Sequence, residues 1–376
     1  MIETLALAAL VLALLPALMA LVNLAIYRPP PPPDLRRHPS VSLLIPARDE
    51  EANIAAALDA AARSEGVELE IVVLDDHSTD RTGDIVTGRA ARDPRIRLES
   101  APRLPRGWSG KQHACFTLAR LARHPLLVFV DADVRLMPDA LARLARVLET
   151  RDAGLVSGFP EQSTGTFAER LLIPLIHVLL LGYLPMAGLR WTCLPGFGAA
   201  CGQLIAVRAD AYWKAGGHAA IRGSLHDGVT LPRAFRHAGV MTHLNDATGI
   251  ARCRMYRGFD ELWRGFSKNA TEGMATPVAL PVWTVLLIGG HVLPWLLLAA
   301  AFVSGAGAAV WLTAALAVGL NLLLRGTLAV RFRQSPAGLV LHPIAVLVLL
   351  ALQWTALINH LRGRPAVWRN RAYSPG

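Results

Sequence analysis

The chain has 376 residues and a formal net charge of +10, and 53% of its residues are hydrophobic, which gives a mean hydropathy of +0.37. These values argue against a purely soluble protein and predict segments that lie in a membrane. The positive charge suits an anionic membrane face or an acidic substrate, whereas no basic run alternates with aromatic residues as a nucleic-acid groove would require.

Apolar stretches lie near both ends of the chain. Residues 4–26 are uncharged and apolar; this is too long for the core of a typical signal peptide, and their start lacks basic residues. We therefore predict that residues 1–28 form a transmembrane anchor. Three further apolar segments predict that residues 274–361 lie in the membrane, and residues 362–376 follow as a basic tail.

The arginines beside these segments do not agree on one topology. Arg28, Arg36 and Arg37 follow the anchor and place the next part of the chain in the cytoplasm by the positive-inside rule. Three crossings after a cytoplasmic domain would then place the basic tail outside, against the same rule. We predict a multi-pass protein of the cell membrane with a cytoplasmic central domain, and we leave open whether every C-terminal segment crosses.

The central part, residues 40–273, alternates between strand-like and helix-like segments behind a stiff Pro-rich spacer at residues 29–39. Strands are predicted in "VSLLIP", "EIVVLDD", "RIRLES" and "LLVFVDAD", each followed by a helical pattern, which is typical of a doubly wound α/β fold. Residues 168–190 hold an apolar segment with two prolines. We interpret it as interfacial, because a crossing there would separate acidic residues that are expected to meet.

Two carboxylates follow the fourth predicted strand. Its five apolar residues, Leu126 to Val130, suit the buried centre of a parallel sheet, and Asp131 and Asp133 come directly after them. We expect ionised carboxylates at the carboxyl edge, where open α/β sheets place their ligands. Carboxylates spaced by one residue can reach one Mg²⁺ or Mn²⁺ together with substrate phosphates. Taken alone, this short pattern more often marks a polar strand end.

The first two predicted strands end in charged residues as well. "IPARDEE" places Arg48 and Glu50 after the first strand. "VVLDDHSTDRT" places Asp75 and Asp76 after the second, where carboxylates can accept hydrogen bonds from a nucleobase or a ribose. The three stretches together resemble the family 2 glycosyltransferases, whose members combine a P-x-x-x-E turn, D-D-x-S-x-D-x-T and D-x-D. In this chain they are Pro46 to Glu50, Asp75 to Thr82 and Asp131 to Asp133.

This resemblance covers Val41 to about Gly273. It implies the nucleotide-binding α/β fold called GT-A, with a nucleotide sugar as the donor. The residues that it assigns to binding of the nucleotide sugar are Pro46, Arg48, Glu50, Asp75, Asp76 and Asp131. It assigns the metal to Asp131 and Asp133, with Asp133 nearer to the ion. His77 departs from the family, which usually has Gly at this position.

A lysine opens the helix predicted after the third strand. In "GWSGKQHAC", Lys111 adds an ammonium group to a helix start, which already favours anions. We expect it to contact the donor or its diphosphate. The alternative is an exposed lysine in the first turn of the helix.

Inverting transfer to a hydroxyl requires a base that takes the proton of the acceptor. Family members place this carboxylate in an E-D or D-D pair before a helix. In "RGSLHDGVTLPRAF" the pair is His226 and Asp227, so the resemblance implies that Asp227 is the base and that His226 tunes it or contacts the diphosphate or acceptor. The alternative makes Asp227 an N-cap.

The segment before the C-terminal apolar region lacks the Q-x-x-R-W motif with which processive synthases hold a growing glycan. We therefore expect a single transfer. Trp263 and Lys268 either line the acceptor entrance or belong to an amphipathic helix at the membrane interface.

The layout resembles polytopic family members that glycosylate carotenoids, hopanoids or related polyisoprenoids. It implies inverting transfer of one hexose from a UDP-sugar to a lipid hydroxyl, assisted by Mg²⁺ or Mn²⁺, and no nucleic-acid partner. Two alternatives remain: a polyprenyl-phosphate glycosyltransferase, and a non-catalytic membrane scaffold or transporter that keeps a nucleotide-sugar-binding domain.

Overall fold

The computed structural model describes residues 1–34, 36–364, 366–368 and 371–373, so part of the expected basic tail lies outside the described residues. The chain forms two compact units. The first, which we call the α/β unit, comprises Tyr27–Ser163 and Ala187–Met255. The second, which we call the helical unit, comprises Met1–Ile26, Thr164–Met186 and Tyr256–Gly376.

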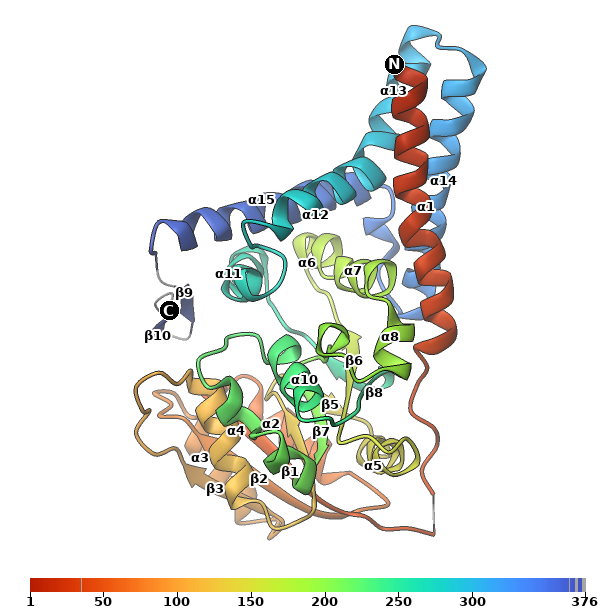
Figure 1. Cartoon of the computed structure of the whole chain (residues 1–376). Helices are drawn as coiled ribbons and strands as arrows, with labels where there is room; N and C mark the ends of the chain where they lie inside the picture. The colour runs from red at the N-terminus through yellow and green to blue at the C-terminus, as the bar shows by residue number, and fades with distance from the viewer. Residues whose placement is uncertain (35, 365, 369–370, 374–376) are drawn as a thin grey trace. The chain divides into compact units, whose positions relative to one another are not determined.

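The α/β unit contains a mixed sheet of eight strands in the order β3-β2-β1-β4-β7-β6-β8-β5 (Figure 1). The strands are β1 (Ser40–Ala47), β2 (Glu68–Asp75), β3 (Ile96–Ser100), β4 (Leu126–Val130), β5 (Val134–Leu136), β6 (Leu155–Gln162), β7 (Leu204–Arg208) and β8 (Thr242–Cys253). The helices are α2 (Ile54–Ala62), α3 (Thr82–Ala90), α4 (Gly110–Leu121), α5 (Ala140–Thr150), α8 (Met186–Trp191), α9 (Ala209–Lys214) and α10 (Asp227–His237).

The pairing of β1 with both β2 and β4 creates the edge at which ligands are expected. All three strands are parallel, and Ala47 at the end of β1 lies opposite Asp75 at the end of β2. The strand order therefore reverses between β1 and β4, where α/β sheets open a crevice at their carboxyl ends. Strand β7 runs antiparallel to β4, so the residues before β7 arrive at the same edge.

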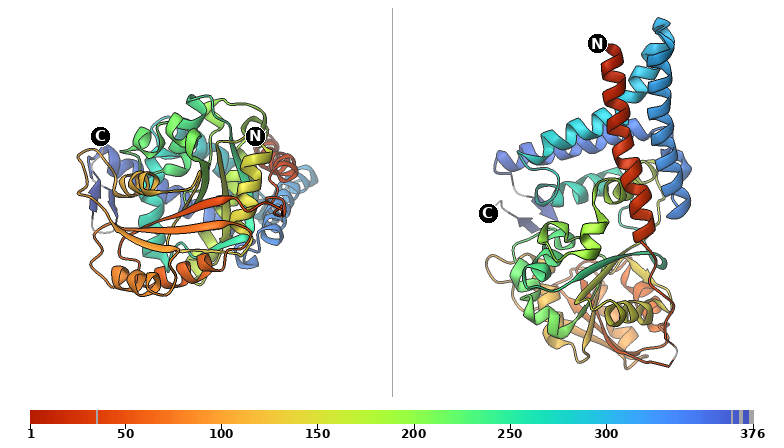
Figure 2. Two further views of the ribbon diagram at one scale, coloured as in Figure 1. Left: turned by 90° about the horizontal axis from the view of Figure 1, so that it is seen from below. Right: turned by 45° about the vertical axis from the view of Figure 1, so that its right-hand side comes forward.

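Helices cover both faces of this sheet, because its strands alternate apolar side chains between two cores (Figure 2). Val41, Leu43 and Ile45 of β1 pack in one core with residues of α2 and α5. Leu44 of β1 packs in the other core with residues of α4 and α10. The core on the second face thus holds α4 and α10, which both begin at the carboxyl edge of the sheet.

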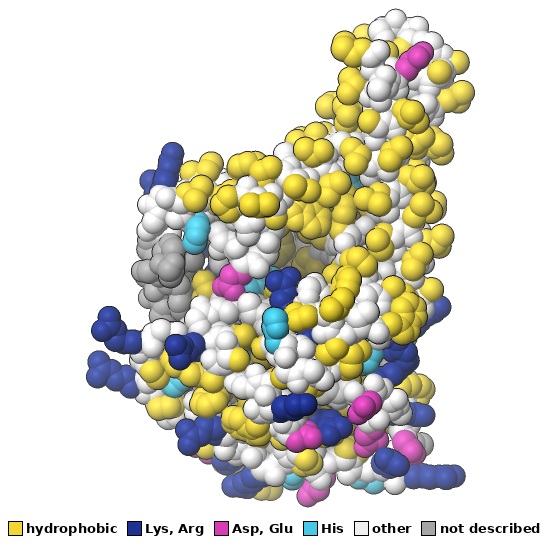
Figure 3. Space-filling view, viewed as in Figure 1, with side chains coloured by type: hydrophobic (Ala, Val, Ile, Leu, Met, Phe, Trp, Pro, Cys, Tyr) yellow, Lys and Arg dark blue, Asp and Glu magenta, His cyan; other side chains and the backbone are white. Residues whose placement is uncertain are grey.

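The helical unit holds four helices long and apolar enough to cross a membrane, which are Ile2–Ile26, Ala279–Ser304, Ala308–Arg331 and His342–Leu361. This confirms the predicted membrane helices by length and composition and supports association with a membrane. Hydrophobic side chains cover much of their surface (Figure 3). The elements are α1 (Ile2–Ile26), α6 (Phe167–Leu172), α7 (Leu175–Tyr183), α11 (Phe259–Asn269), α12 (Ala279–Leu287), α13 (Leu293–Ser304), α14 (Ala308–Arg331), α15 (His342–Leu361), β9 (Ala366–Trp368) and β10 (Arg371–Tyr373).

Within the helical unit, the long helices take two directions. Helices α1, α13 and α14 run side by side, whereas α12 and α15 run across them (Figures 1 and 2). A π-helical turn at Ile288–Val292 separates α12 from α13 and accompanies the bend between them. Residues 168–190 lie in the three short helices α6, α7 and α8 rather than in one long helix. Helix α7 is tied to α1 by Asn23, whose amide donates to the carbonyl of Leu181 at 2.8 Å.

Candidate functional site

The ammonium group of Lys111 joins two carboxylates at the carboxyl edge of the sheet. Its Nζ atom lies 2.8 Å from Oδ1 and 3.0 Å from Oδ2 of Asp131, and 3.0 Å from Oδ2 of Asp227. It also donates to the carbonyl of Gly202 at 3.1 Å. The structure thus brings together the end of β4, the start of α4, the start of α10 and the segment that leads into β7.

The local structure of α4 explains the position of Lys111. Ser109 is the N-cap, and its hydroxyl accepts a hydrogen bond from the Gln112 amide, which satisfies a free donor of the first turn. Lys111 is the second residue of the helix, and Asp131 follows β4 directly. Because β4 lies beside β1 in the sheet, its end meets the helix that starts at the same edge.

The start of α4 also fixes the loop that precedes Asp227. The backbone amide of Ser109 donates to the carbonyl of Arg222 at 2.7 Å, and the side chain of Gln112 donates to the carbonyl of Ser224 at 3.2 Å. Asp227 is the first residue of α10, and its Oδ1 accepts from the amide of Gly228 at 2.8 Å. These contacts hold the Asp227 carboxylate at the position that Lys111 reaches.

Two glycines allow the start of α10 to approach the chain before β7. A Cβ atom at Gly202 would lie 2.2 Å from Oδ1 of Asp227, and one at Gly228 would lie 2.6 Å from the carbonyl oxygen of Ala200. The amide of Ala200 donates to the carbonyl of Gly228 at 2.7 Å. Any side chain at Gly202 would therefore displace the Asp227 carboxylate, so this position requires glycine.

Asp227 is held ionised by its surroundings. It is buried, and burial alone would raise its pKa, but the charge of Lys111 and its hydrogen bond outweigh burial and lower the pKa to about 2. Burial would likewise lower the pKa of Lys111, but the carboxylates of Asp131 and Asp227 raise it well above its ordinary value. The lysine is therefore positive and Asp227 negative at any physiological pH.

Asp133 has the opposite electrostatic environment. Burial raises its pKa to about 7, and the neighbouring charges of Asp131 and Glu50 act in the same direction. Among the described residues, its Oδ1 is buried and has no hydrogen-bond partner. A divalent cation beside this carboxylate would relieve both the repulsion and the unpartnered oxygen, so the residues present fit such an ion.

The described part of the chain contains no group of three or more His, Cys, Asp or Glu side chains that could hold a metal ion unaided. Both oxygens of Asp131 already lie within 3.0 Å of Lys111. Asp133 is therefore the carboxylate most available to an ion, and the remaining ligands would come from substrate phosphates and water, as is usual for Mg²⁺.

The turns that follow β1 and β2 contact each other and hold the predicted donor-binding residues. We call these two turns the turn pair. Arg48 donates to the carbonyl of Asp76 at 2.7 Å, and the amide of Asp76 donates to the carbonyl of Ala47 at 2.8 Å. Pro46 lies in β1 opposite Leu74 of β2. The structure therefore places Pro46, Arg48 and Asp76 side by side at the carboxyl edge.

Glu50 and Asp75 complete this turn pair. The amide of Glu50 donates to the hydroxyl of Thr82 at 2.8 Å, and Asp75 accepts from the amide of Ser78 at 3.0 Å. Glu50 is also close enough to Asp133 to affect its pKa, which brings the loop after β1 near the carboxylates after β4.

His77 lies in the left-handed backbone region, with φ at +57°. This region favours glycine, because a Cβ atom clashes there with the backbone. The conformation explains why glycine suits this position in proteins that share the motif. It also shows that the turn tolerates histidine at the cost of some backbone strain.

His226 directly precedes Asp227 in the chain, whereas Trp263 and Lys268 belong to the helical unit. His226 is the N-cap residue of α10, half-buried, with its amide bonded to the hydroxyl of Ser224 at 3.0 Å. Trp263 and Lys268 lie on α11 of the helical unit, and both are half-buried. Their predicted contacts with the acceptor or diphosphate stay a prediction.

Sequence reasoning missed a buried polar network behind Asp133. Gln162 donates to the side-chain oxygen of Gln203 at 2.9 Å, and Gln203 donates to the sulfur of Cys253 at 2.9 Å. The Cys253 thiol in turn is placed to hydrogen-bond to Asp133. Cys253 could be found only from the sheet register, where it lies opposite Val134, the residue after Asp133.

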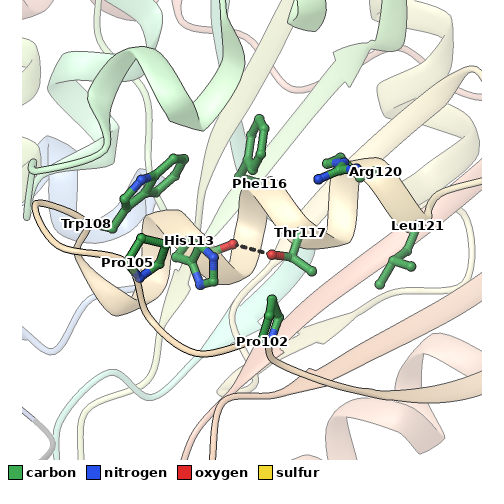
Figure 4. Close-up of a pocket in the computed structure, with 8 residues that line it drawn as sticks. All are labelled: Pro102, Pro105, Trp108, His113, Phe116, Thr117, Arg120 and Leu121. Carbon is green, nitrogen blue, oxygen red and sulfur yellow. Dashed lines mark hydrogen bonds between the residues drawn. The ribbon is translucent and has the colours of Figure 1, made fainter.

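A separate pocket of about 460 Å³ lies along α4 (Figure 4). It is lined by Pro102, Pro105, Trp108, His113, Phe116, Thr117, Arg120 and Leu121. None of these residues belongs to the cluster around Lys111, and the lining is mostly apolar and aromatic. We therefore assign the pocket no part in the chemistry at the carboxyl edge.

Comparisons with known proteins agree with these motifs. Residues 42–214 match the model of the family described as glycosyl transferase family 2. Two curated relatives are 4,4'-diaponeurosporenoate glycosyltransferases. The protein of Staphylococcus haemolyticus (strain JCSC1435) is 25% identical over 240 residues, and that of Staphylococcus aureus (strain USA300) is 26% identical over 241 residues. Each alignment covers 63% of this chain and 62% of the relative, which is less than two thirds of the relative's length.

A solved structure matches nearly the whole chain. It is the mannosyltransferase PcManGT from Pyrobaculum calidifontis, in complex with GDP-Man and Mn²⁺. It is 20% identical, covers 96% of this chain and 99% of its own, and superposes with a TM-score of 0.55. This likeness concerns the fold. Together with the family match, it confirms the predicted GT-A fold with accompanying apolar helices.

Proposed function

We propose that this chain, which carries a family 2 glycosyltransferase domain, transfers one sugar from a nucleotide sugar to an apolar polyisoprenoid lipid in the membrane, with inversion at the anomeric carbon. The observation that carries the proposal is the ion-paired cluster in which Lys111 contacts both Asp131 and Asp227. The proposed base Asp227, the cation Lys111 and the proposed metal ligand Asp131 then lie together at one edge of the sheet, as sugar transfer requires.

In the proposed reaction the acceptor hydroxyl gives its proton to the carboxylate of Asp227. The acceptor oxygen forms a bond to the anomeric carbon as the bond from that carbon to the diphosphate oxygen breaks, and the nucleoside diphosphate leaves with the electron pair. Lys111 lies beside Asp227 and provides a positive charge for the departing phosphates. Displacement from the face opposite the leaving group gives inversion.

We assign the metal to Asp133, with Asp131 as the second carboxylate. A divalent ion bound there, Mg²⁺ or Mn²⁺, supplies a positive charge that stabilises the diphosphate as it leaves. The unpartnered oxygen of Asp133 and its raised pKa support this assignment. A solved structure of similar fold holds Mn²⁺ together with its nucleotide sugar.

We assign the donor to the turn pair at the ends of β1 and β2. Pro46, Arg48 and Asp76 lie beside one another there, with Asp75 and Glu50 next to them. Carboxylates at this edge suit the hydroxyls of a ribose or the N–H groups of a nucleobase. The motifs favour a UDP-sugar, whereas the solved structure of similar fold binds GDP-Man. The test below therefore compares UDP-sugars with a GDP-sugar.

The acceptor class is supported by the relatives and by the apolar helices. Both curated relatives are named for diaponeurosporenoate, a carotenoid acid. The helical unit offers a large apolar surface on which such a lipid could lie. We therefore propose a carotenoid, hopanoid or related polyisoprenoid as the acceptor.

An ionised acceptor is the second candidate, and one observation favours it. Lys111 lowers the pKa of Asp227 to about 2, which makes this carboxylate a weak base as long as the lysine is paired with it and not with the diphosphate. A carboxylate or phosphate acceptor is already ionised and needs no base. This candidate includes polyprenyl-phosphate acceptors, and the two candidates differ in their demand for Asp227.

We propose a multi-pass protein whose α/β unit is cytoplasmic. Arg28 follows α1, and Arg331 and Arg333 lie at or after the end of α14, which is the pattern of cytoplasmic ends. Helix α15 runs across α14 and α1 (Figure 1), so we place it along the cytoplasmic membrane surface. This leaves α1, residues 288–304 (the π-helical turn with α13) and α14 to cross. It puts the basic tail in the cytoplasm, which removes the conflict between the tail and the positive-inside rule.

The direct test incubates membranes that contain the full chain with Mn²⁺ and labelled UDP-glucose, UDP-galactose or GDP-mannose, followed by mass analysis of the extracted lipids. We expect one lipid species to gain a single hexose with one of these donors. Membranes with Asp133→Asn serve as the control. If no donor labels a lipid and none is hydrolysed, the chain is a non-catalytic scaffold or transporter and the proposal is wrong.

A further inference from the structure

Arg325 of α14 is an arginine buried without a counterion. Its side chain is 0% exposed, and its Nη1 donates to the carbonyl of Pro174 at 3.3 Å. Among the described residues, its Nε and Nη2 atoms have no hydrogen-bond partner, and no carboxylate forms an ion pair with it. Nothing in the chemistry proposed above uses this residue.

The two unpartnered nitrogens form one edge of the guanidinium group. The Nε–H and Nη2–H bonds point the same way, which is the geometry with which arginine binds both oxygens of a carboxylate or phosphate. An arginine stays charged in proteins, and leaving that charge buried and unpaired is strongly unfavourable. Ionisable residues among membrane helices usually mark a functional site for this reason. The empty edge therefore indicates an anionic ligand.

The surroundings of Arg325 also favour an anionic ligand. His342 is the first residue of α15 and is completely buried, and its Nδ1 has no partner among the described residues. Its Nε2 lies 3.0 Å from Nδ1 of His291, and both histidines are close enough to Arg325 to interact with its charge. The start of α15, a helix of 20 residues, adds a positive partial charge. The cluster has donors to offer and carries no negative charge.

A short turn lies against the guanidinium group of Arg325. Pro336–Gly338 forms a single 3-10 turn between α14 and α15, and a Cβ atom at Gly338 would lie 3.1 Å from Nη2 of Arg325. Pro336 and Ala337 are exposed. Displacement of these three residues would open a path to Nη2 without unwinding of a long helix.

We propose that Arg325 binds the acidic head group, a carboxylate or a phosphate, of an apolar-chain lipid. The other side of α14 is apolar and exposed, with Leu323 65% and Val330 85% accessible, so a hydrocarbon chain has a surface to follow near the site. The assignment of this lipid as the acceptor rests on the proposed function in its second form, transfer to an ionised acceptor. Binding of an apolar acid to Arg325 does not.

The test measures binding without any nucleotide sugar, on the full chain purified in a neutral detergent. The probes are all-trans-retinoic acid with its alcohol, retinol, and farnesyl phosphate with its alcohol, farnesol. For the wild-type chain we expect at least about tenfold tighter binding of an acid than of its alcohol, because charge-assisted hydrogen bonds form only with the acid. The stronger of the two acids identifies the head group as carboxylate or phosphate.

Arg325→Met is the key variant, and it should fold, because it replaces a buried unpaired charge with an apolar chain of similar length. We expect it to bind acid and alcohol equally. Arg331→Met, on the same helix but partly exposed, should keep the acid preference. Arg325→Lys keeps the charge but cannot form the bidentate contact, so its preference for the acid should fall. This variant replaces Arg325→Met in the test if Arg325→Met does not fold.

Equal binding of acid and alcohol by the wild-type chain, or an acid preference that survives in Arg325→Met, would overturn the proposal. Failure of the proposed transfer is recognised separately. A chain that binds the acid through Arg325 but labels no lipid with any donor keeps this site and loses the transferase assignment.

Discussion

Lys111 and Asp227 form an ion pair of 3.0 Å between the first turns of two helices, α4 and α10. The pair forms because both helices pack on the same face of the sheet and begin at its carboxyl edge. Lys111 holds the second carboxylate, Asp131, at the same time. A single ammonium group therefore lies between two carboxylates and offsets the repulsion between them.

Replacement of this lysine by an apolar residue should cost stability as well as activity. In Lys111→Met, the buried carboxylate of Asp227 loses its counterion, and Lys111 is itself one-third exposed, so we expect a loss of about 1–3 kcal/mol. Lys111→Arg keeps the charge and should recover most of this loss. Thermal unfolding of the full chain in detergent measures both variants against Lys214→Met, an exposed lysine on α9. Equal unfolding temperatures for all three would contradict the role of the ion pair.

Gly202 is expected to be essential for the position of the proposed base. The added Cβ of Gly202→Ala would lie 2.2 Å from Oδ1 of Asp227, so the carboxylate or the backbone must move. We expect at least about a hundredfold loss of sugar transfer, as for a misplaced catalytic group. Gly249→Ala is the matched control, because no atom lies within 4 Å of its added Cβ. Transfer by Gly202→Ala at the wild-type rate would show that Asp227 need not stay where the structure has it.

Asp227→Asn distinguishes between the two acceptor classes. The amide has nearly the shape of the carboxylate but cannot take a proton, so transfer to a hydroxyl should fall by about 10²–10⁴. Transfer to a carboxylate or phosphate acceptor should fall much less. The assay compares retinol with retinoic acid as acceptors for the same membranes. A uniform loss with both acceptors would instead indicate that Asp227 serves mainly to hold Lys111.

The sequence predicted the parts of the fold that depend on local pattern. β1, β2 and β4 contain short apolar runs that end in charged turns, β3 alternates apolar and charged residues, and each was predicted within a few residues. β6 was missed because "LVSGFPEQ" contains Gly and Pro, which usually interrupt a strand. β8 was missed because "THLNDATGIARC" mixes polar and apolar residues, as a strand with bulged pairing does. The insertion of antiparallel β7 between β4 and β6 depends on distant pairing that no local pattern encodes.

The candidate site likewise contains residues that the sequence predicted and residues that it did not. Lys111, Asp131 and Asp227 were nominated by motifs, since each lies where a strand ends or a helix begins. Gly202, Gln203 and Cys253 belong to no motif, and only the sheet register brings them to the carboxylates. His77 shows the limit of a motif: its departure from Gly is visible in the sequence, but the backbone at φ +57° that gives the departure meaning is not.

Glu70 should give the α/β unit a defined dependence on acid. Burial would raise its pKa, but hydrogen bonds from Ser42 and the amide of Arg123, with the charge of Arg97, lower it below 4.5. A lowered pKa in the folded state adds stability that is fully present above pH 4.5 and is lost as the pH falls through the folded pKa. Unfolding temperatures between pH 6 and pH 3 should therefore fall more steeply for the wild-type chain than for Glu70→Gln.

Glu65→Gln, at an exposed glutamate, should follow the wild-type profile in the same measurement. Parallel profiles for the wild type and Glu70→Gln would mean that the hydrogen bonds to Glu70 do not favour its ionised form.

The crosswise direction of α15 predicts the side of the C-terminus. In the proposed topology, α1, α13 and α14 cross and return the chain to the cytoplasm, and α15, which runs across them, lies along the membrane surface. A green fluorescent protein fused after residue 376 should fluoresce, and alkaline phosphatase fused at the same point should be inactive, because each folds on one side only. Fusions after Ser304, in the turn between α13 and α14, should give the opposite pair of results. Active phosphatase at the C-terminus would mean that α15 crosses and that the basic tail breaks the positive-inside rule.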